Sequence, residues 1–282
     1  MPQPRKQFGQ HWLQSEKALS QIVAAANLQK GDEQNRGDRV LEIGPGKGIL
    51  TRQLLQDAES VVAVEIDRDL CELLAKKLGG ITNFLLLQGD FLAIDFNHLL
   101  TPFPTFQSPN KVVANIPYNI TGPILEKLLG TIAQPNPHPY DLIVLLVQRE
   151  VALRLKSNAG SSHFGALSVR VQYLAECDFI CDVPAKAFYP PPKVDSAVIR
   201  LRPRSLTIPA HDPQKLEMLL KLGFSSKRKM LRNNLQSVVD RDQLGELLAS
   251  LGANSQARAE ELSVTQWVAL SNQLAFDLGN GK

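Results

Sequence analysis

The sequence is poor in three features that would have pointed to particular classes of protein. It has only three cysteines, Cys71, Cys177 and Cys181, and no two have the C-x-x-C spacing of a metal or redox site. Reduced thiols are therefore favoured over a disulfide framework. No apolar run is long enough to span a membrane, the longest in the strand-rich region being Leu142 to Val147. The basic start, Met1 to Lys6, is followed by no apolar signal segment. We expect a cytoplasmic protein with no membrane association and no metal site.

Charge is also scarce as an overall signal. The net charge is only +3, with 44% hydrophobic and 21% charged residues. These values are ordinary for a globular protein with a substantial core. They do not by themselves predict a nucleic-acid partner, so the distribution of the charge matters more. A length of 282 residues allows one large domain and a small one.

The most informative stretch runs from Val40 to Thr51. Its apolar first half predicts a buried strand, and its second half has Gly44, Gly46 and Gly48 in a turn that opens a helix. The third glycine comes one position too early for a dinucleotide fingerprint. With Glu42 just before the turn, the spacing resembles the S-adenosylmethionine (SAM) loop of class I methyltransferases. We expect Gly44 and Gly46 to contact a cofactor.

Acidic residues follow the next two apolar runs. Glu65 lies about twenty residues after Gly44, where a nucleotide-binding α/β unit has the acid that grips ribose. Asp90 follows the next run and could accept from an adenine amino group. Their neighbours Ile66 and Phe91 belong to the same predicted pocket. Because parallel strands end at one edge of a sheet, these residues predict a single crevice.

A fourth apolar run ends in Asn115-Ile116-Pro117-Tyr118. The Asn115 oxygen and the Ile116 carbonyl could hold the hydrogens of an aromatic amine and localise its lone pair. Pro117 stiffens the turn and has no competing N–H. Tyr118 offers a stacking face for a base. Phe188, ahead of a proline-rich run, is predicted to form the second face of a base clamp.

Strands and helices alternate from Arg39 to Val147, which predicts a doubly wound α/β domain. Late strands near Asp178–Val183 and Ser196–Leu201 should close the sheet. Ser15 should cap a helix that reaches about Asn27. The proline-rich stretch from Pro203 to Pro213 marks a domain boundary, beyond which the pattern is helical.

A basic cluster lies in this helical part, and it contains no acid. Its members are Lys221, Lys227, Arg228, Lys229 and Arg232. We expect Phe224–Leu235 to form a helix with a cationic, RNA-binding face, with Lys193 as a further RNA contact. Arg200, Arg202 and Arg204 are nearby in sequence and should extend this surface.

Together these motifs resemble the small-subunit ribosomal RNA adenine N6,N6-dimethyltransferases of the KsgA type. The resemblance begins at Arg5–Leu13, passes through the SAM loop, the tetrapeptide and Phe188–Val198, and continues into 227–235 and 258–263. It implies a class I SAM-dependent methyltransferase (Rossmann-like) sheet with a small C-terminal all-helical domain. By position it implies SAM contacts from His11, Leu13, Gly44, Glu65, Asp90 and Asn115.

The resemblance also implies dimethylation of two adjacent adenosines near the 3′ end of small-subunit (16S) rRNA in an assembling subunit, by a protein we expect to be monomeric. The implied domains are a SAM-binding domain over 1–203, with residues 1–14 as an arm over the cofactor site, and an RNA- or ribosome-binding domain over 204–282.

Two alternatives remain open at this point. One is a large-subunit rRNA adenine methyltransferase of the antibiotic-resistance type, which shares the SAM half. The other is a non-catalytic nucleic-acid-binding protein on the same fold, against which the intact Gly44, Glu65, Asp90 and Asn115 argue. A DNA adenine methyltransferase usually has a second proline where Ile116 stands.

Overall fold

The computed structural model describes residues 3–5, 8–32 and 34–274. Its contacts divide the chain into two compact units. The first consists of Met1–Leu128, His138–Ala152 and Cys177–Pro203, and the second of Leu129–Pro137, Leu153–Glu176 and Arg204–Lys282. The sequence-based boundary after residue 203 coincides with one of these transitions. The second unit additionally includes two earlier segments, and the roles proposed for the two domains remain predictions.

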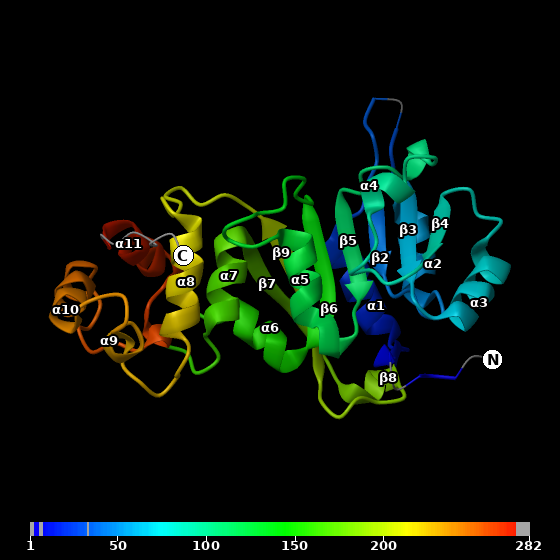
Figure 1. The fold of residues 1–282 in the computed structure, drawn as a ribbon. Coiled ribbons are helices and arrows are strands. Elements are labelled where there is room, and N and C mark those ends of the chain that lie inside the picture. Colours follow the sequence, from blue (N-terminus) through cyan, green and yellow to red (C-terminus); the bar gives the residue numbers. More distant parts are fainter. Residues whose placement is uncertain (1–2, 6–7, 33, 275–282) are drawn as a thin grey trace. The chain divides into compact units, whose positions relative to one another are not determined.

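The first unit carries a seven-stranded sheet with the order β4-β3-β2-β5-β6-β9-β7 (Figure 1). The strands are β2 (Arg39–Ile43), β3 (Ser60–Glu65), β4 (Phe84–Gln88), β5 (Lys111–Asn115), β6 (Leu142–Gln148), β7 (Ala175–Val183) and β9 (Ser196–Pro203). The first five are mutually parallel, and β9 is antiparallel to β6. All five predicted parallel strands and both late strands are confirmed. Chain order reverses between β2 and β5, which creates a crevice at their carboxyl ends.

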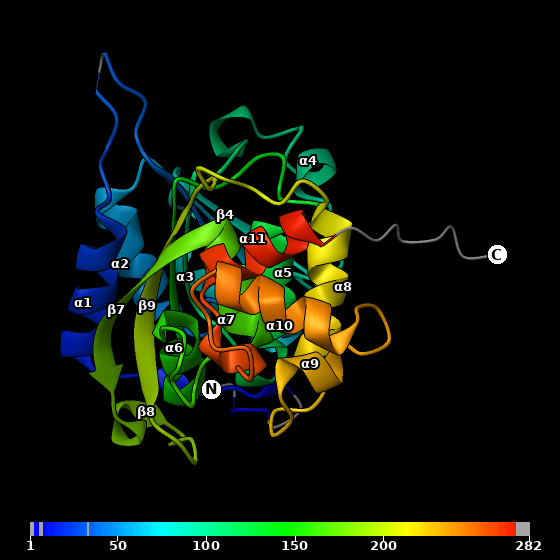
Figure 2. The same ribbon diagram turned by 90° about the vertical axis from the view of Figure 1, so that its left-hand side faces the viewer.

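The central strands of the sheet are deeply buried because helices cover them. Every residue of β3, and all but the last of β6, is buried, as expected for parallel strands covered on both faces. The helices of this region are α1 (Glu16–Ala26), α2 (Ile49–Asp57), α3 (Arg68–Leu78), α4 (Phe96–Leu99) and α5 (Thr121–Leu129). Helices α1 and α2 lie side by side on one face of the sheet (Figure 2).

Helix α1 shows why the sequence is a good guide here. Ser15 is its N-cap and accepts from the N–H of Ala18, and Asn27 ends it in the left-handed conformation. Its apolar stripe, which includes Leu19 and Ile22, packs in a core cluster with residues of β2, β3 and β6.

A two-stranded antiparallel ribbon joins distant parts of the first unit. Strand β1 (Trp12–Leu13) pairs with β8 (Phe188–Tyr189), with Trp12 opposite Tyr189 and Leu13 opposite Phe188. Leu13 and Phe188 are both buried in the core cluster. The predicted arm over residues 1–14 is thus anchored through its last residues.

The second unit is helical. It contains the second half of α6 (Arg149–Lys156), and all of α7 (Ala166–Leu174), α8 (Pro213–Gly223), α9 (Leu231–Asn234), α10 (Arg241–Ser250) and α11 (Val264–Gln273). Trp267 of α11 is fully buried and stacks on Phe224 at 5.5 Å between ring centroids. Glu217 of α8 accepts from the Ile132 N–H at 3.1 Å and pairs with Arg170 of α7 at 2.8 Å. These bonds explain why segments before residue 177 group with this unit.

Two structural expectations in the basic region are wrong. Residues 224–230 form turns rather than a helix, and only Leu231–Asn234 is helical. The Asn234 side chain donates to the carbonyls of Gly223 and Ser226, which stabilises the turn. Serines in this stretch favour such local bonding over a helix.

The second correction concerns the three arginines of the 200–204 stretch, which do not form a free phosphate-binding surface. Arg200 and Arg202 both pair with Asp178, at 3.0 and 2.7 Å, and Arg204 pairs with Glu176 at 3.0 Å. Residues two apart on a strand share a face, so alternating acids on β7 meet alternating arginines. The partners lie more than twenty residues apart in the sequence, so this pairing could not be predicted from the sequence alone.

Candidate active site

A pocket lies at the carboxyl ends of the parallel strands, where the crevice was predicted. Its lining comes from the N-terminal arm and from the loops after β2, β3, β4 and β5. The residues are Phe8, Gly9, Gln10, His11, Trp12, Ile43, Gly44, Gly46, Val64, Glu65, Ile66, Leu70, Gly89, Asp90, Phe91, Asn115, Ile116, Pro117, Tyr118 and Ile120. The structure thus brings together most of the cofactor and catalytic residues predicted from the sequence.

Gly46 shows why the loop after β2 needs glycine. Its φ is +58°, and a Cβ at this position would lie 3.1 Å from Cδ1 of Trp12. A side chain would therefore be strained and would also press on the pocket wall. The freed backbone N–H of Gly46 donates to Glu65 at 3.1 Å. The glycine loop is thus hydrogen-bonded to the acid that ends β3.

Glu65 is held in a fixed orientation at the pocket. Only 5% of its surface is exposed, and its two carboxylate oxygens accept from the N–H groups of Gly46 and Asp67. Burial raises the pKa of Glu65, and these two bonds oppose the shift. Each carboxylate oxygen has a second lone pair, so the group can still accept from a diol.

Asp90 and Ile66 lie at the pocket margin. Asp90 is exposed, and one of its oxygens accepts from the Leu92 N–H at 2.9 Å. Its other oxygen can serve a ligand. The exposed apolar surface of Ile66 (46%) and the buried ring of Phe91 lie next to these acids. An aromatic base between Ile66 and Phe91 would be held by apolar contacts with its faces and by hydrogen bonds to its polar edge.

Asn115, at the end of β5, has its amide nitrogen already bonded. Its Nδ2 donates to the backbone carbonyl of His11 at 3.1 Å. The same side chain has Oδ1 as its acceptor, and Asn115 lines the pocket. The bond fixes the carboxamide with the acceptor available for a substrate amine.

Tyr118 and His11 stack on each other beside this amide. Their ring centroids are 5.8 Å apart with an interplanar angle of 18°. His11 Nδ1 is 2.7 Å from the Pro190 carbonyl and must carry a proton there, because a carbonyl only accepts. The Tyr118 hydroxyl is 2.5 Å from Ser196 Oγ. Burial raises the pKa of Tyr118, so the phenol stays protonated at neutral pH and cannot act as a base.

Two predicted site residues are not brought to this pocket. Phe188 is only 3% exposed and packs in the core cluster. It would have to leave the core to stack on a base, so we do not carry the clamp role forward. Leu13 is also in the core, although it borders a smaller cavity with Glu42, Gly44 and Asn115.

Sequence reasoning missed a buried acid behind the pocket. Glu42 is 1% exposed, and its Oε2 has no hydrogen-bond partner among the described residues. Burial, with the nearby charge of Glu65, raises the pKa of Glu42 to about 8. The sequence indicates its position next to the glycine loop, but the burial of this acid has no sequence signal of its own.

The predicted RNA-binding residues differ in the unit to which they belong and in how exposed they are. Lys193 is exposed in the first unit. In the second unit Lys221, Arg228 and Lys229 are exposed and Arg232 is half-buried. Lys227 differs because its Nζ donates to the Ser162 carbonyl at 2.6 Å. Lys227 therefore also stabilises the local fold.

Among the described residues, no group of three or more His, Cys, Asp or Glu side chains is arranged to hold a metal ion. None of the helices in that part of the chain has the length and apolarity needed to cross a bilayer.

Comparison with known proteins decides the family. The model for the family described as "Ribosomal RNA adenine dimethylase" matches residues 1–275. The chain belongs to this family. A relative from Nostoc punctiforme, named "Ribosomal RNA small subunit methyltransferase A", is 66% identical over 279 residues, covering 99% of this chain and 98% of the relative.

Solved structures agree on the fold. A dimethyladenosine transferase from Plasmodium falciparum has a TM-score of 0.73 at 25% identity, covering 92% of this chain and 96% of that one. The 23S rRNA methyltransferase ErmE has a TM-score of 0.71 at 28% identity, covering 92% and 98%. The class I methyltransferase fold is confirmed.

The family membership confirms the predicted activity as well. The enzyme is an rRNA adenine dimethyltransferase, and the much higher identity to small-subunit methyltransferases decides against the large-subunit alternative. Membership of a dimethylase family also decides against the non-catalytic alternative. Family and fold together imply SAM as the methyl donor and rRNA as the substrate.

Proposed function

We propose that the enzyme dimethylates N6 of two adjacent adenosines near the 3′ end of 16S rRNA, and that it acts as a cytoplasmic monomer on the assembling small subunit. The relatives are small-subunit methyltransferases by name, which supports the choice of the small subunit. The observation that carries the chemistry is the fixed carboxamide of Asn115, a residue that lines the pocket and whose Nδ2 is hydrogen-bonded to the His11 carbonyl.

The pocket residues fit SAM by the chemistry of their donors and acceptors. Glu65 would accept from the ribose hydroxyls, and Asp90 with Phe91 and Ile66 would hold the adenine. The close approach of backbone at Gly46, where a side chain would press on Trp12, leaves room along the loop for a ligand. We propose Gly44, Gly46 and the backbone of His11 as further contacts. SAM, when bound, supplies an electrophilic methyl group.

The chain's own residues would activate the adenine amine by position. Oδ1 of Asn115 and the carbonyl of Ile116 accept from the two amine hydrogens, which weakens delocalisation of the nitrogen lone pair. Pro117 contributes no N–H that competes for these acceptors. The Tyr118 ring orients the base by stacking. Alignment and fixed dipoles then lower the barrier without a strong base.

Tyr118 should act through its ring rather than its hydroxyl. We expect Tyr118→Phe to retain most of the methylation rate, because the stacking face remains, but to destabilise the protein by about 1 kcal/mol, because buried Ser196 loses its partner. Tyr118→Ala should lose most of the rate. Single-turnover assays and urea unfolding measure the two effects.

Ser196→Ala is the matched control for this comparison. It removes the same hydrogen bond and leaves the ring, so it should reproduce the loss of stability without a loss of rate. Equal losses of rate in Tyr118→Phe and Tyr118→Ala would assign the function to the hydroxyl and overturn the stacking role.

The exposed cations of the second unit should contact rRNA phosphates. For the double variant Arg228→Ala/Lys229→Ala we expect weaker binding to immature subunits. The slope of log affinity against log salt should fall by roughly 0.7–0.9 per lost phosphate contact. SAM affinity should not change. Filter binding over a salt series measures the slope.

The double variant Lys76→Ala/Lys77→Ala removes two exposed cations from α3 and serves as the control. Its slope should equal that of the parent. An unchanged slope in the 228/229 variant would show that these side chains are only a solvated surface.

Mass spectrometry of rRNA fragments tests the proposed substrate. Naked 16S rRNA and immature small subunits are methylated in parallel, and the modified nucleotides are mapped. Two adjacent dimethyladenosines near the 3′ end of the subunit-bound rRNA are expected. Methylation elsewhere, or of naked rRNA alone, would contradict the proposal.

A further inference from the structure

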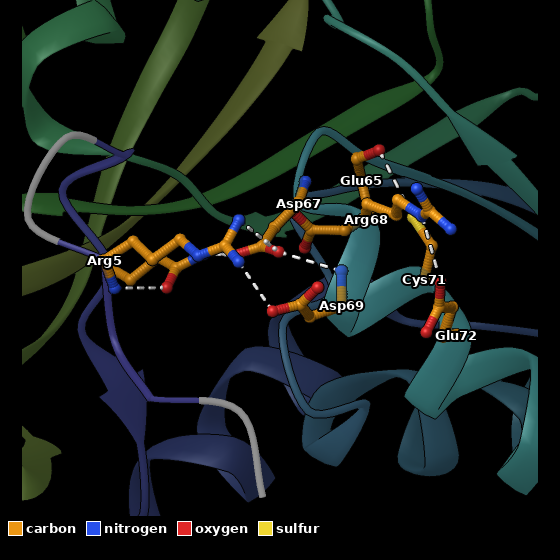
Figure 3. A network of polar contacts seen from close by, with 8 residues as sticks. Arg5, Glu65, Asp67, Arg68, Asp69, Cys71 and Glu72 are labelled. Atoms are coloured by element: carbon orange, nitrogen blue, oxygen red, sulfur yellow. Dashed lines mark hydrogen bonds and ion pairs between the residues drawn. The ribbon is translucent and has the colours of Figure 1, made fainter.

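Arg5 joins the N-terminal arm to the start of α3, as Figure 3 shows. Its Nη1 is 3.2 Å from Oδ1 of Asp67, and its Nη2 is 2.6 Å from Oδ2 of Asp69. Gln10 adds a second link, since its Oε1 accepts from the Arg5 backbone N–H at 2.8 Å and its Nε2 donates to Asp67 at 3.0 Å. We call Arg5, Gln10, Asp67 and Asp69 the arm clasp.

Asp67 is the buried centre of the clasp. Only 1% of its surface is exposed, so its charge depends on partners within the protein. These are Arg5, Gln10 and the backbone N–H of Asp69, for which Asp67 is the N-cap of α3. By contrast, Arg5 and Asp69 are partly exposed, with side-chain exposures of 40% and 54%. The Arg5–Asp69 contact alone is therefore expected to contribute little.

The clasp touches the cofactor pocket in two places. The backbone N–H of Asp67 donates to Oε1 of Glu65 at 2.9 Å, so the residue that receives Arg5 also orients the proposed ribose acid. Gln10 itself lines the pocket, as do His11 and Trp12, which follow it. Beyond them β1 is held by its pairing with β8. The described wall from Gln10 to Trp12 is thus anchored at one end by the clasp and at the other by the ribbon.

We propose that Arg5 is a positioning residue for SAM binding. It compensates the buried charge of Asp67. It thereby fixes the pocket wall from Gln10 to Trp12 and the carboxylate of Glu65, without touching the ligand. This inference rests on the proposed cofactor site.

Calorimetric titration of SAM into the full-length protein tests the clasp. For Arg5→Gln we expect Kd to rise about fivefold at low salt, whereas Asp69→Asn should change it less than about twofold. The difference in Kd between Arg5→Gln and the parent should decrease as the salt concentration is raised from about 50 to about 500 mM, because screening weakens the parent's ion pair. Arg5→Lys keeps the charge and should recover part of the affinity.

Arg68→Gln is the matched control. Arg68 is a neighbouring arginine on α3 whose ion pair, to Glu72 at 3.0 Å, lies on the exposed surface (Figure 3). It should bind SAM as the parent does, at both salt concentrations. In steady-state assays Arg5→Gln should raise KM for SAM and leave kcat at saturating SAM unchanged, a separation that general destabilisation would not produce.

Acrylamide quenching gives a second measure. The chain has two tryptophans, Trp12 in the pocket wall and Trp267, which is fully buried in the second unit. Because Trp267 is shielded, increased quenching in Arg5→Gln would report a less ordered wall at Trp12. If Arg5→Gln does not fold, Asp67→Asn replaces it, because asparagine retains the N-cap while losing the charge.

The outcomes separate this inference from the proposed function. If Glu65→Ala weakens SAM binding and Arg5→Gln, or Asp67→Asn in its place, leaves Kd and quenching unchanged, the clasp has no positioning role and the cofactor site stands. If the parent itself does not bind SAM, the proposed cofactor site fails. A fivefold loss in Arg68→Gln as well would also overturn the clasp, because the effect would then be one of general surface charge.

Discussion

Replacing Asn115 with alanine should lower the single-turnover rate of adenine methylation by about a hundredfold or more, while RNA affinity stays within about twofold. The reason is the geometry of the carboxamide, whose nitrogen is fixed by the His11 carbonyl. The remaining acceptor is Oδ1 of Asn115, which hydrogen-bonds the adenine amine most strongly when the lone pair of the amine nitrogen becomes available for attack. Removing Oδ1 should therefore destabilise the transition state more than it weakens RNA binding.

Two further variants sharpen this experiment. Asn115→Asp retains an acceptor but loses the donor to His11, so it should fall between the parent and Asn115→Ala. Asn119→Ala, in the same loop but outside the pocket lining, should behave as the parent. Parallel losses of rate and RNA affinity in Asn115→Ala would show that Asn115 only binds substrate.

Glu42→Gln should make the protein more stable than the parent in alkaline solution. The folded-state pKa of Glu42 is raised from 4.5 to about 8. Between these values the unfolded chain releases the proton and the folded protein retains it, so the parent loses stability as pH rises through this window. The full difference is on the order of 5 kcal/mol. Glutamine is neutral and avoids this loss.

Urea unfolding at pH 5, 7 and 8.5 measures the effect. The advantage of Glu42→Gln should be small at pH 5 and greatest above pH 8. Emission from Trp12 follows the unit that contains Glu42, and emission from Trp267 follows the other unit. Glu126→Gln, an exposed acid in the first unit, should show no such trend. A constant difference across this range would show that Glu42 is already ionised in the folded protein.

Local signals explain what could be predicted from the sequence. The strand ends that bear Gly44, Glu65, Asp90 and Asn115 were found because each apolar run is continuous and ends in a polar residue. Parallel topology then brings such ends to one edge. The cap at Ser15 needed only its own turn of helix.

What could not be predicted depends on pairing between distant segments. The ring of Phe188 was expected over the active site, but strand β8 pairs with β1 and buries it in the core. Arg200 was expected to be free, but its partner Asp178 lies on another strand. A helix was expected over 224–235, but residues 224–230 form turns that the side chain of Asn234 stabilises, and only Leu231–Asn234 is helical. The sequence of a single chain does not show which of its distant segments are in contact.

The β1–β8 ribbon has a consequence for biosynthesis. Trp12 leaves the ribosome early, but its pairing partner Tyr189 is made only after the five parallel strands. The nascent enzyme can therefore form much of its sheet while the wall of the cofactor pocket still lacks one of its two anchors. Tight SAM binding should appear only once residue 189 has been added, about two-thirds of the way through translation. The enzyme that modifies ribosomal RNA would thus acquire its methyl donor only in the last third of its own synthesis.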